Sequence, residues 1–160
     1  RVLNAIRCRI LKFHHQYCFS FGYNIVINSV GGIMGQFSIL GFIALGGAFG
    51  ACSRYLISEL CVILLGRGFP YGTLTVNVVG SFIMGLLIAA FDNELLATEP
   101  WRQVIGLGFL GALTTFSTFS MDNVLLMQQG AFLKMGLNIL LNVVLSISAA
   151  WIGFQLLMRS

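Results

Sequence analysis

Four long apolar stretches, separated by short polar loops, dominate the chain from about residue 37 onwards. They cover about residues 37–65, 71–91, 103–127 and 132–158. A helix needs about 20 consecutive apolar residues to cross the hydrocarbon core of a bilayer, and each stretch is long enough. The loops between them carry the glycine, proline and charged residues that end helices. The pattern predicts an all-α integral membrane protein with four transmembrane helices.

Hydroxyl side chains interrupt the third stretch. Residues 111–120 read Gly-Ala-Leu-Thr-Thr-Phe-Ser-Thr-Phe-Ser, with five hydroxyl groups within seven residues. Polar or non-helical backbone at membrane depth occurs only where it is buried in protein or lines a wet cavity. Broken helices at mid-bilayer hold the ion sites of membrane transport proteins. We therefore predict that the third helix is broken at mid-membrane and lines a pore.

Two other stretches carry uncharged polar side chains at intervals of four residues, which places them on one helix face. They are Thr73, Asn77 and Ser81 in the second stretch, and Asn138, Asn142 and Ser146 in the fourth. An asparagine at mid-span must bond to something other than lipid. Asn77 either joins two helices or faces a pore, and its alignment with hydroxyl residues favours the pore. Such uncharged stripes suit a small ion better than a large organic substrate.

The composition agrees with a membrane protein. Of 160 residues, 58% are hydrophobic and 9% are charged, whereas soluble domains carry about 25% charged residues. A chain of this length cannot enclose a wide aqueous path alone, so conduction would require a homo-oligomer. No span pairs a nucleophile with a histidine or clusters carboxylates. We expect neither an enzyme nor a protein that binds nucleic acid.

Basic residues are balanced between the two sides of the membrane. Four spans place the loops of Arg67 and Lys134 on one side, and the Arg102 loop and the Arg159 tail on the other. The positive-inside rule, which counts basic residues near span ends, therefore predicts no orientation. A chain without such a bias can insert both ways, and an antiparallel dimer can then form from a single sequence.

Residues 1–33 differ in character from the rest of the chain. They begin with a cluster of basic residues, and histidine, glutamine and asparagine break up the later apolar run. A signal or transit segment is one interpretation. We favour an N-terminal extension outside the working protein, which then begins near Met34. The four-helix subunit is accordingly expected over residues 34–160.

Two charged side chains stand inside the first stretch. Arg54 is either functional, because charges within a span are costly, or it lies near the span's end and extends its guanidinium to the interface. Glu59 supports an alternative function, since a small proton-coupled cation or drug exporter needs a titratable carboxylate within a span. Glu59 lies towards the end of its span and lacks a polar stripe around it, which disfavours that alternative.

Three blocks of sequence, in order and suitably spaced, resemble the signature blocks of the Fluc (CrcB) fluoride channels. They are Gly-Gly-Ala-Phe-Gly-Ala-Cys-Ser-Arg-Tyr at 46–55, Gly-Thr-Leu-Thr-Val-Asn-Val-Val-Gly-Ser at 72–81, and residues 108–120. The resemblance covers roughly residues 34–160. It implies a fluoride-selective channel that exports fluoride passively from the cytoplasm across the bacterial inner membrane and protects the cell from fluoride toxicity.

The resemblance also implies an antiparallel, dual-topology homodimer with two pores along its interface. Asn77 matches the family's pore asparagine, Phe116 and Phe119 match two phenylalanines that face the ion, and Arg54 matches an arginine of the first helix. A structural sodium ion at the dimer centre would be bound by the backbone carbonyl groups of Gly111 and Thr114. The further polar positions assigned to the fluoride path are Thr73, Thr115, Thr118, Asn142 and Ser146.

These residue types make the implied chemistry intelligible. Fluoride is small and strongly hydrated, so a selective pore must replace water with closely spaced donors. The Asn77 amide offers two N–H donors and each hydroxyl offers one. Aromatic ring edges are electropositive, so Phe116 and Phe119 can face an anion without a formal charge, although core packing is the alternative interpretation. A ring of fixed cations would hold the ion too firmly, because conduction requires that it also leaves.

Overall fold

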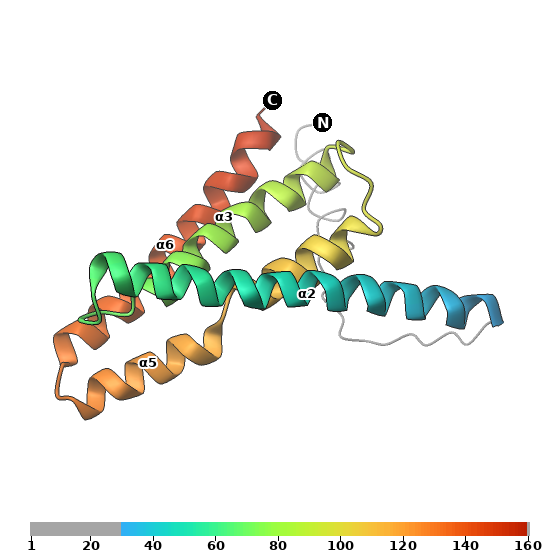
Figure 1. The fold of residues 1–160 in the computed structure, drawn as a ribbon. Helices are drawn as coiled ribbons and strands as arrows, with labels where there is room; N and C mark the ends of the chain where they lie inside the picture. Colours follow the sequence, from blue (N-terminus) through green and yellow to red (C-terminus); the bar gives the residue numbers. More distant parts are fainter. Residues whose placement is uncertain (1–29, 160) are drawn as a thin grey trace. The chain divides into compact units, whose positions relative to one another are not determined.

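The computed structural model describes residues 30–159, which form helices joined by short loops (Figure 1). The elements are α2 (Val30–Leu65), α3 (Tyr71–Asp92), the π-helix η1 (Arg102–Leu110), α4 (Gly111–Leu113), α5 (Phe116–Gln128) and α6 (Phe132–Met158). The chain from Met34 onwards forms one compact unit. Nearly all of the expected N-terminal extension lies outside the described residues, so its role stays a prediction.

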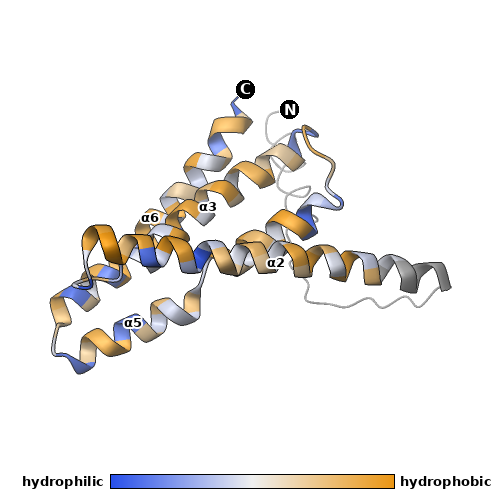
Figure 2. Cartoon of the chain, in the orientation of Figure 1, coloured by the Kyte–Doolittle hydropathy of each residue, from blue (hydrophilic) through white to orange (hydrophobic). Residues whose placement is uncertain are grey.

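Four helical segments are long and apolar enough to cross a membrane. They are Phe37–Leu65, Tyr71–Asp92, Arg102–Gln128 and Phe132–Met158, within one residue of the predicted spans at every end. Figure 2 shows mainly apolar residues along the helices, with polar residues at the loops and at a few positions within helices such as α2 and α5. Large apolar side chains such as Ile63, 76% exposed, cover the outside, as expected where lipid is the solvent. The predicted all-helical membrane architecture is confirmed.

The third span is interrupted where the hydroxyl-rich sequence predicted. Helix α4 ends at Leu113, and Thr114 and Thr115 are extended, with ψ angles of 152° and 116°. Helix α5 then resumes at Phe116. The first half of this span winds as the π-helix η1, which the sequence pattern did not predict. Its glycines weaken the preference for regular α-helix, and the wide winding directs Gly106 towards α3 and Gly108 towards α2.

Helices α3 and α6 run side by side in the same direction and pack closely along their length (Figure 1). Gly85 on α3 lies against the backbone oxygen of Ala150, and Gly153 on α6 lies against the backbone oxygen of Phe82. A Cβ atom at either glycine would collide with the facing carbonyl. This reciprocal contact is the small-residue packing by which membrane helices approach each other without a hydrophobic driving force.

Helix α2 meets η1 in the same manner. Gly46 and Gly50 face the backbone oxygens of Val104 and Phe109, and Gly108 faces the backbone of Ile43 and Gly46. Because both helices carry glycine where they meet, their backbones can come into direct contact. Gly46 and Gly50 stand one helical turn apart, so both lie on the face of α2 that meets η1.

We predict that Gly85→Ala lowers the melting temperature of the purified protein in detergent. The added methyl group meets a backbone carbonyl that cannot rotate away, and overpacking of this kind costs about 1–3 kcal/mol. Gly136→Ala on α6 is the matched control, because no heavy atom lies within 4 Å of its added Cβ. Alanine's higher helix propensity should leave that control unchanged or slightly stabilised. Equal melting temperatures for the two variants would contradict the close contact.

Candidate functional site

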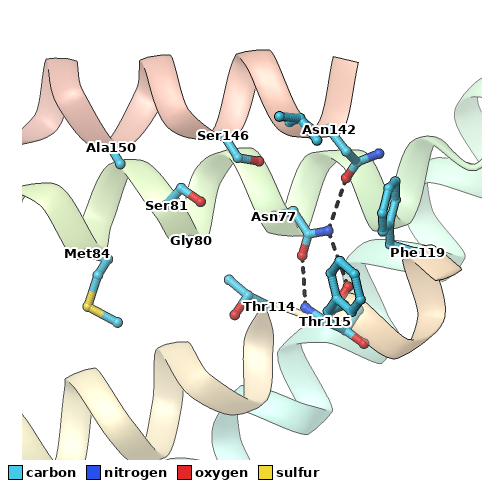
Figure 3. A pocket seen from close by; sticks show the side chains of 12 residues that line it. Asn77, Gly80, Ser81, Met84, Thr114, Thr115, Phe119, Asn142, Ser146 and Ala150 are labelled. Carbon is cyan, nitrogen blue, oxygen red and sulfur yellow. Dashed lines mark hydrogen bonds between the residues drawn. The ribbon is translucent and has the colours of Figure 1, made fainter. Parts of the chain in front are cut away.

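A groove of about 380 Å³ lies where α3, α6 and the break in the third span meet (Figure 3). Its walls combine amides, hydroxyls and two phenylalanine rings, and none of the lining side chains carries a formal charge. The lining residues are Asn77, Gly80, Ser81 and Met84 from α3, Thr114, Thr115, Phe116 and Phe119 from the third span, and Asn142, Val143, Ser146 and Ala150 from α6. The structure thus gathers most of the residues that the sequence assigned to a pore.

Side chains replace the missing helical hydrogen bonds at the break. The backbone N–H of Thr115 donates to Asn77 Oδ1 at 2.8 Å. One turn later, the N–H of Thr118 donates to Thr115 Oγ1 at 3.2 Å. In a continuous helix these two amides would bond to the carbonyl groups of Gly111 and Thr114. The break therefore deprives both carbonyl groups of their helical donors, and these are the two carbonyls that the resemblance assigned to a sodium ion.

Asn77 lies in the groove wall, but its amide is engaged within the subunit (Figure 3). Its Nδ2 atom donates to Asn142 Oδ1 at 3.0 Å and to the backbone oxygen of Thr115 at 3.3 Å. An amide nitrogen carries two N–H groups, so both have partners. We expected these donors to face an ion, and the structure instead uses them to hold the break against α3 and α6.

Phe116 and Phe119 border the groove as a tilted aromatic pair. Their ring centroids lie 5.5 Å apart with an interplanar angle of 50°. Phe119 is buried, with 8% of its surface exposed, whereas Phe116 is 79% exposed. A tilted pair directs ring edges as well as ring faces towards its surroundings, and the edges are electropositive. The groove therefore has favourable positions for an anion without a cationic side chain.

Ser146 supplies a hydroxyl group without a hydrogen-bond partner among the described residues. Its Oγ atom is buried and makes no hydrogen bond within the described part of the chain. An unsatisfied buried hydroxyl is costly, and such groups in native proteins call for an explanation such as an ion or a water molecule. Ser146 lies one helical turn beyond Asn142 on the groove face of α6, where it can donate to a small ligand in the groove.

Residues 41–154 match the protein family described as CrcB-like protein, Camphor Resistance (CrcB). The chain belongs to this family. The match includes all three sequence blocks on which the resemblance was based, and the resemblance is therefore confirmed.

Named relatives of the CrcB family cover most of this chain. The fluoride-specific ion channel FluC of Vibrio parahaemolyticus serotype O3:K6 is 94% identical over 127 residues, which are 79% of this chain and 100% of that protein. A protein of the same name from Vibrio cholerae serotype O1 is 80% identical over 125 residues, 78% of this chain and 99% of the relative. Another protein of this name, from Photobacterium profundum, is 74% identical over 127 residues, which are 79% of this chain and 100% of the relative. Ion channels are not a class of enzyme.

Two positions that the CrcB resemblance assigned to the fluoride path lie beside the groove rather than in its lining. Thr73 is buried on α3, and its hydroxyl donates to Asp122 Oδ2 at 2.6 Å. Thr118 is exposed on α5, and its hydroxyl accepts from Thr115 Oγ1 at 3.1 Å. Asp122 had not been predicted as part of the site. It follows Thr118 by one helical turn, and this spacing was the available signal.

The two charged residues of the first span lie outside the groove lining. Arg54 is half-buried and Glu59 is exposed, both on α2. The assigned role of Arg54 stays a prediction. A proton-coupled exporter would need Glu59 on the transport path, and the described groove does not contain it.

Four lining residues were missed because they are small or apolar. Gly80, Met84, Val143 and Ala150 carry no polar group that would mark them in sequence. Ala150 continues the four-residue series of Asn142 and Ser146, and that periodicity could have identified it.

We predict that Gly80→Ala destabilises the break and that Thr114→Ser compensates for it. A Cβ at Gly80 would collide with Thr114 Cγ2, while its other neighbours lie at 3.7 Å or beyond. Serine removes that methyl group and keeps the hydroxyl that donates to the Leu110 oxygen at 2.9 Å. Gly80→Ala alone should lower the free energy of unfolding by about 1–3 kcal/mol and therefore the melting temperature. The double variant should recover most of the lost stability. Purely additive effects would contradict this contact as the cause.

Proposed function

We propose that this chain is the subunit of a fluoride-specific ion channel and that fluoride passes along the groove between α3, α6 and the broken third span. The observation that carries the proposal is the uncharged groove, lined by an aromatic pair and a buried hydroxyl without a protein partner. Membership of a family with relatives named as fluoride-specific channels supports it. Fluoride would move passively, leaving the cytoplasm across the bacterial inner membrane.

The groove replaces water around the ion with weak, closely spaced contacts. Because the Asn77 amide is occupied, the donors that remain for an anion are hydroxyl groups, foremost that of Ser146. The edges of Phe116 and Phe119 add a positive electrostatic potential. Without a cation in the lining, no single contact is strong enough to trap the ion. This meets the requirement that binding be favourable enough for entry and weak enough for exit.

A second copy in antiparallel orientation is proposed to complete the pore. The Phe116 ring is 79% exposed although it borders the groove, and a partner surface would cover it. The even distribution of basic residues between the two sides of the membrane permits insertion in both orientations. Two copies related by a two-fold axis in the membrane plane would form two such grooves.

A sodium ion at the centre of that dimer is also proposed. Gly111 and Thr114 fit this role, because side chains have taken the amides that would otherwise bond to their carbonyl oxygens. Carbonyl oxygens suit hard cations. When bound, the cation would neutralise the carbonyl dipoles at the break and link the two subunits.

We predict that liposomes containing the purified full-length chain release fluoride rapidly and retain chloride, followed with ion-selective electrodes. Glu59→Gln should conduct at the wild-type rate, because Glu59 lies outside the groove. The proton-coupled exporter interpretation demands the opposite, a loss of transport in that variant. A folded wild-type protein that released no fluoride would overturn the proposed function.

We further predict that Ser146→Ala slows fluoride release by about tenfold or more, which corresponds to the loss of one hydrogen bond to a charged group. Ser148→Ala is the matched control, because Ser148 lies on the same helix but is exposed and outside the groove. Initial efflux rates from matched liposomes make the comparison. Equal rates for the two variants would remove Ser146 from the conduction path.

A further inference from the structure

Four asparagine side chains, here called the asparagine chain, are hydrogen-bonded in series between α3, α5 and α6. Asn77 donates to Asn142 Oδ1 at 3.0 Å, and Asn142 donates to Asn138 Oδ1 at 2.8 Å. Asn138 donates to Asn123 Oδ1 at 3.0 Å, and Asn123 donates to the backbone oxygen of Phe119 at 2.8 Å. At the other end, Asn77 accepts from the backbone N–H of Thr115. The series thus leaves the third span at residue 115 and returns to it at residue 119.

The two ends of the asparagine chain determine the orientation of every amide within it. A backbone N–H can only donate and a backbone carbonyl can only accept. Asn77 must therefore present its oxygen to Thr115, and each following asparagine must present its oxygen to the one before. At the far end, Asn123 must present its nitrogen to Phe119. Rotating any single amide by 180° would break the bonds on both of its sides, so the four amides keep or lose their arrangement together.

The asparagine chain connects groove positions through residues that lie outside the groove. Asn77 and Asn142 line the groove and are seen joined in Figure 3, whereas Asn138 and Asn123 are absent from its lining. Asn138 is fully buried, with 0% of its surface exposed. The residues bonded at the two ends, Thr115 and Phe119, both line the groove. A change at Asn138 therefore removes no atom of the groove lining, and it can reach the groove through the hydrogen bond to Asn142.

We propose that Asn138 and Asn123 are positioning residues for anion selectivity, because they hold the groove amides and the third span at the spacing that admits fluoride and excludes larger anions. This inference rests on the proposed function.

The alternative is that the series only joins helices. Hydrogen bonds between membrane helices contribute modestly to stability on average, and well-packed apolar side chains would fill the same space. Apolar packing would not, however, impose a direction on the Asn77 and Asn142 amides or connect them to the Phe119 backbone. Selectivity is therefore the property that separates the two interpretations, since a purely structural role would alter stability and leave the ion preference intact.

The test measures fluoride and chloride release from liposomes containing the full chain, together with the melting temperature. Asn138→Leu removes the centre of the series and should lower the fluoride-to-chloride rate ratio by about tenfold or more, because the buried Asn142 and the half-buried Asn123 each lose a side-chain partner. Asn123→Ala, at a half-buried site that tolerates truncation, should change the ratio in the same direction by less. The double variant should resemble Asn138→Leu alone, since the series is already broken.

Asn93→Ala is the matched control. Asn93 also joins two helices, donating to the backbone oxygen of Leu157 at 2.7 Å, but it lies outside the groove lining. Its variant should keep the wild-type ratio. If Asn138→Leu does not fold, Asn123→Ala decides the question. Folded variants with the wild-type ratio would overturn this inference alone, whereas a wild-type protein without fluoride release would overturn the proposed function itself.

Discussion

The structure depends on one constraint, which is that a helix interrupted inside a bilayer must find hydrogen-bond partners for its backbone without water. The break at Thr114 and Thr115 meets this requirement with the side chains of Asn77 and Thr115 itself. Because Asn77 belongs to α3, the break can exist only where α3 lies beside it, and Gly80 leaves the space for Thr114. The groove is a consequence, since the diverging halves of the span cannot fill the volume that a continuous helix would occupy.

The same constraint divides the polar groups around the groove into two sets, those that hold the backbone of the break and those that do not. The groove amides hold the backbone of the break, whereas the buried hydroxyl of Ser146 has no partner among the described residues and the two phenylalanine rings border the groove. The carboxylate of Asp122 is held by Thr73 and does not line the groove. An anion in the proposed path would therefore meet hydroxyl groups and aromatic edges rather than a fixed charge of either sign. Weak contacts of this kind allow an ion both to bind and to leave.

Features that depend on the local sequence could be predicted, whereas features that depend on contacts between helices could not. Span ends follow from apolar length, and the break follows from five hydroxyl groups within seven residues that lipid cannot solvate, so both were predictable. The π-helical winding of η1 was not, because it depends on how Gly106 and Gly108 meet α3 and α2. The polar stripes identified Asn77, Asn142 and Ser146, but not that the first two would bond to each other. Asn123 had no periodic signal, and only its contact with Asn138 reveals it.

The reciprocal glycine contacts between α3 and α6 also have a consequence for motion. Where two backbones touch at Gly85 and again at Gly153, neither helix can rotate or slide past the other without a carbonyl striking a Cα atom. We therefore expect α3 and α6 to move together as one rigid body. A change in the width of the groove would therefore have to come from the third span, whose two halves meet at the extended residues Thr114 and Thr115.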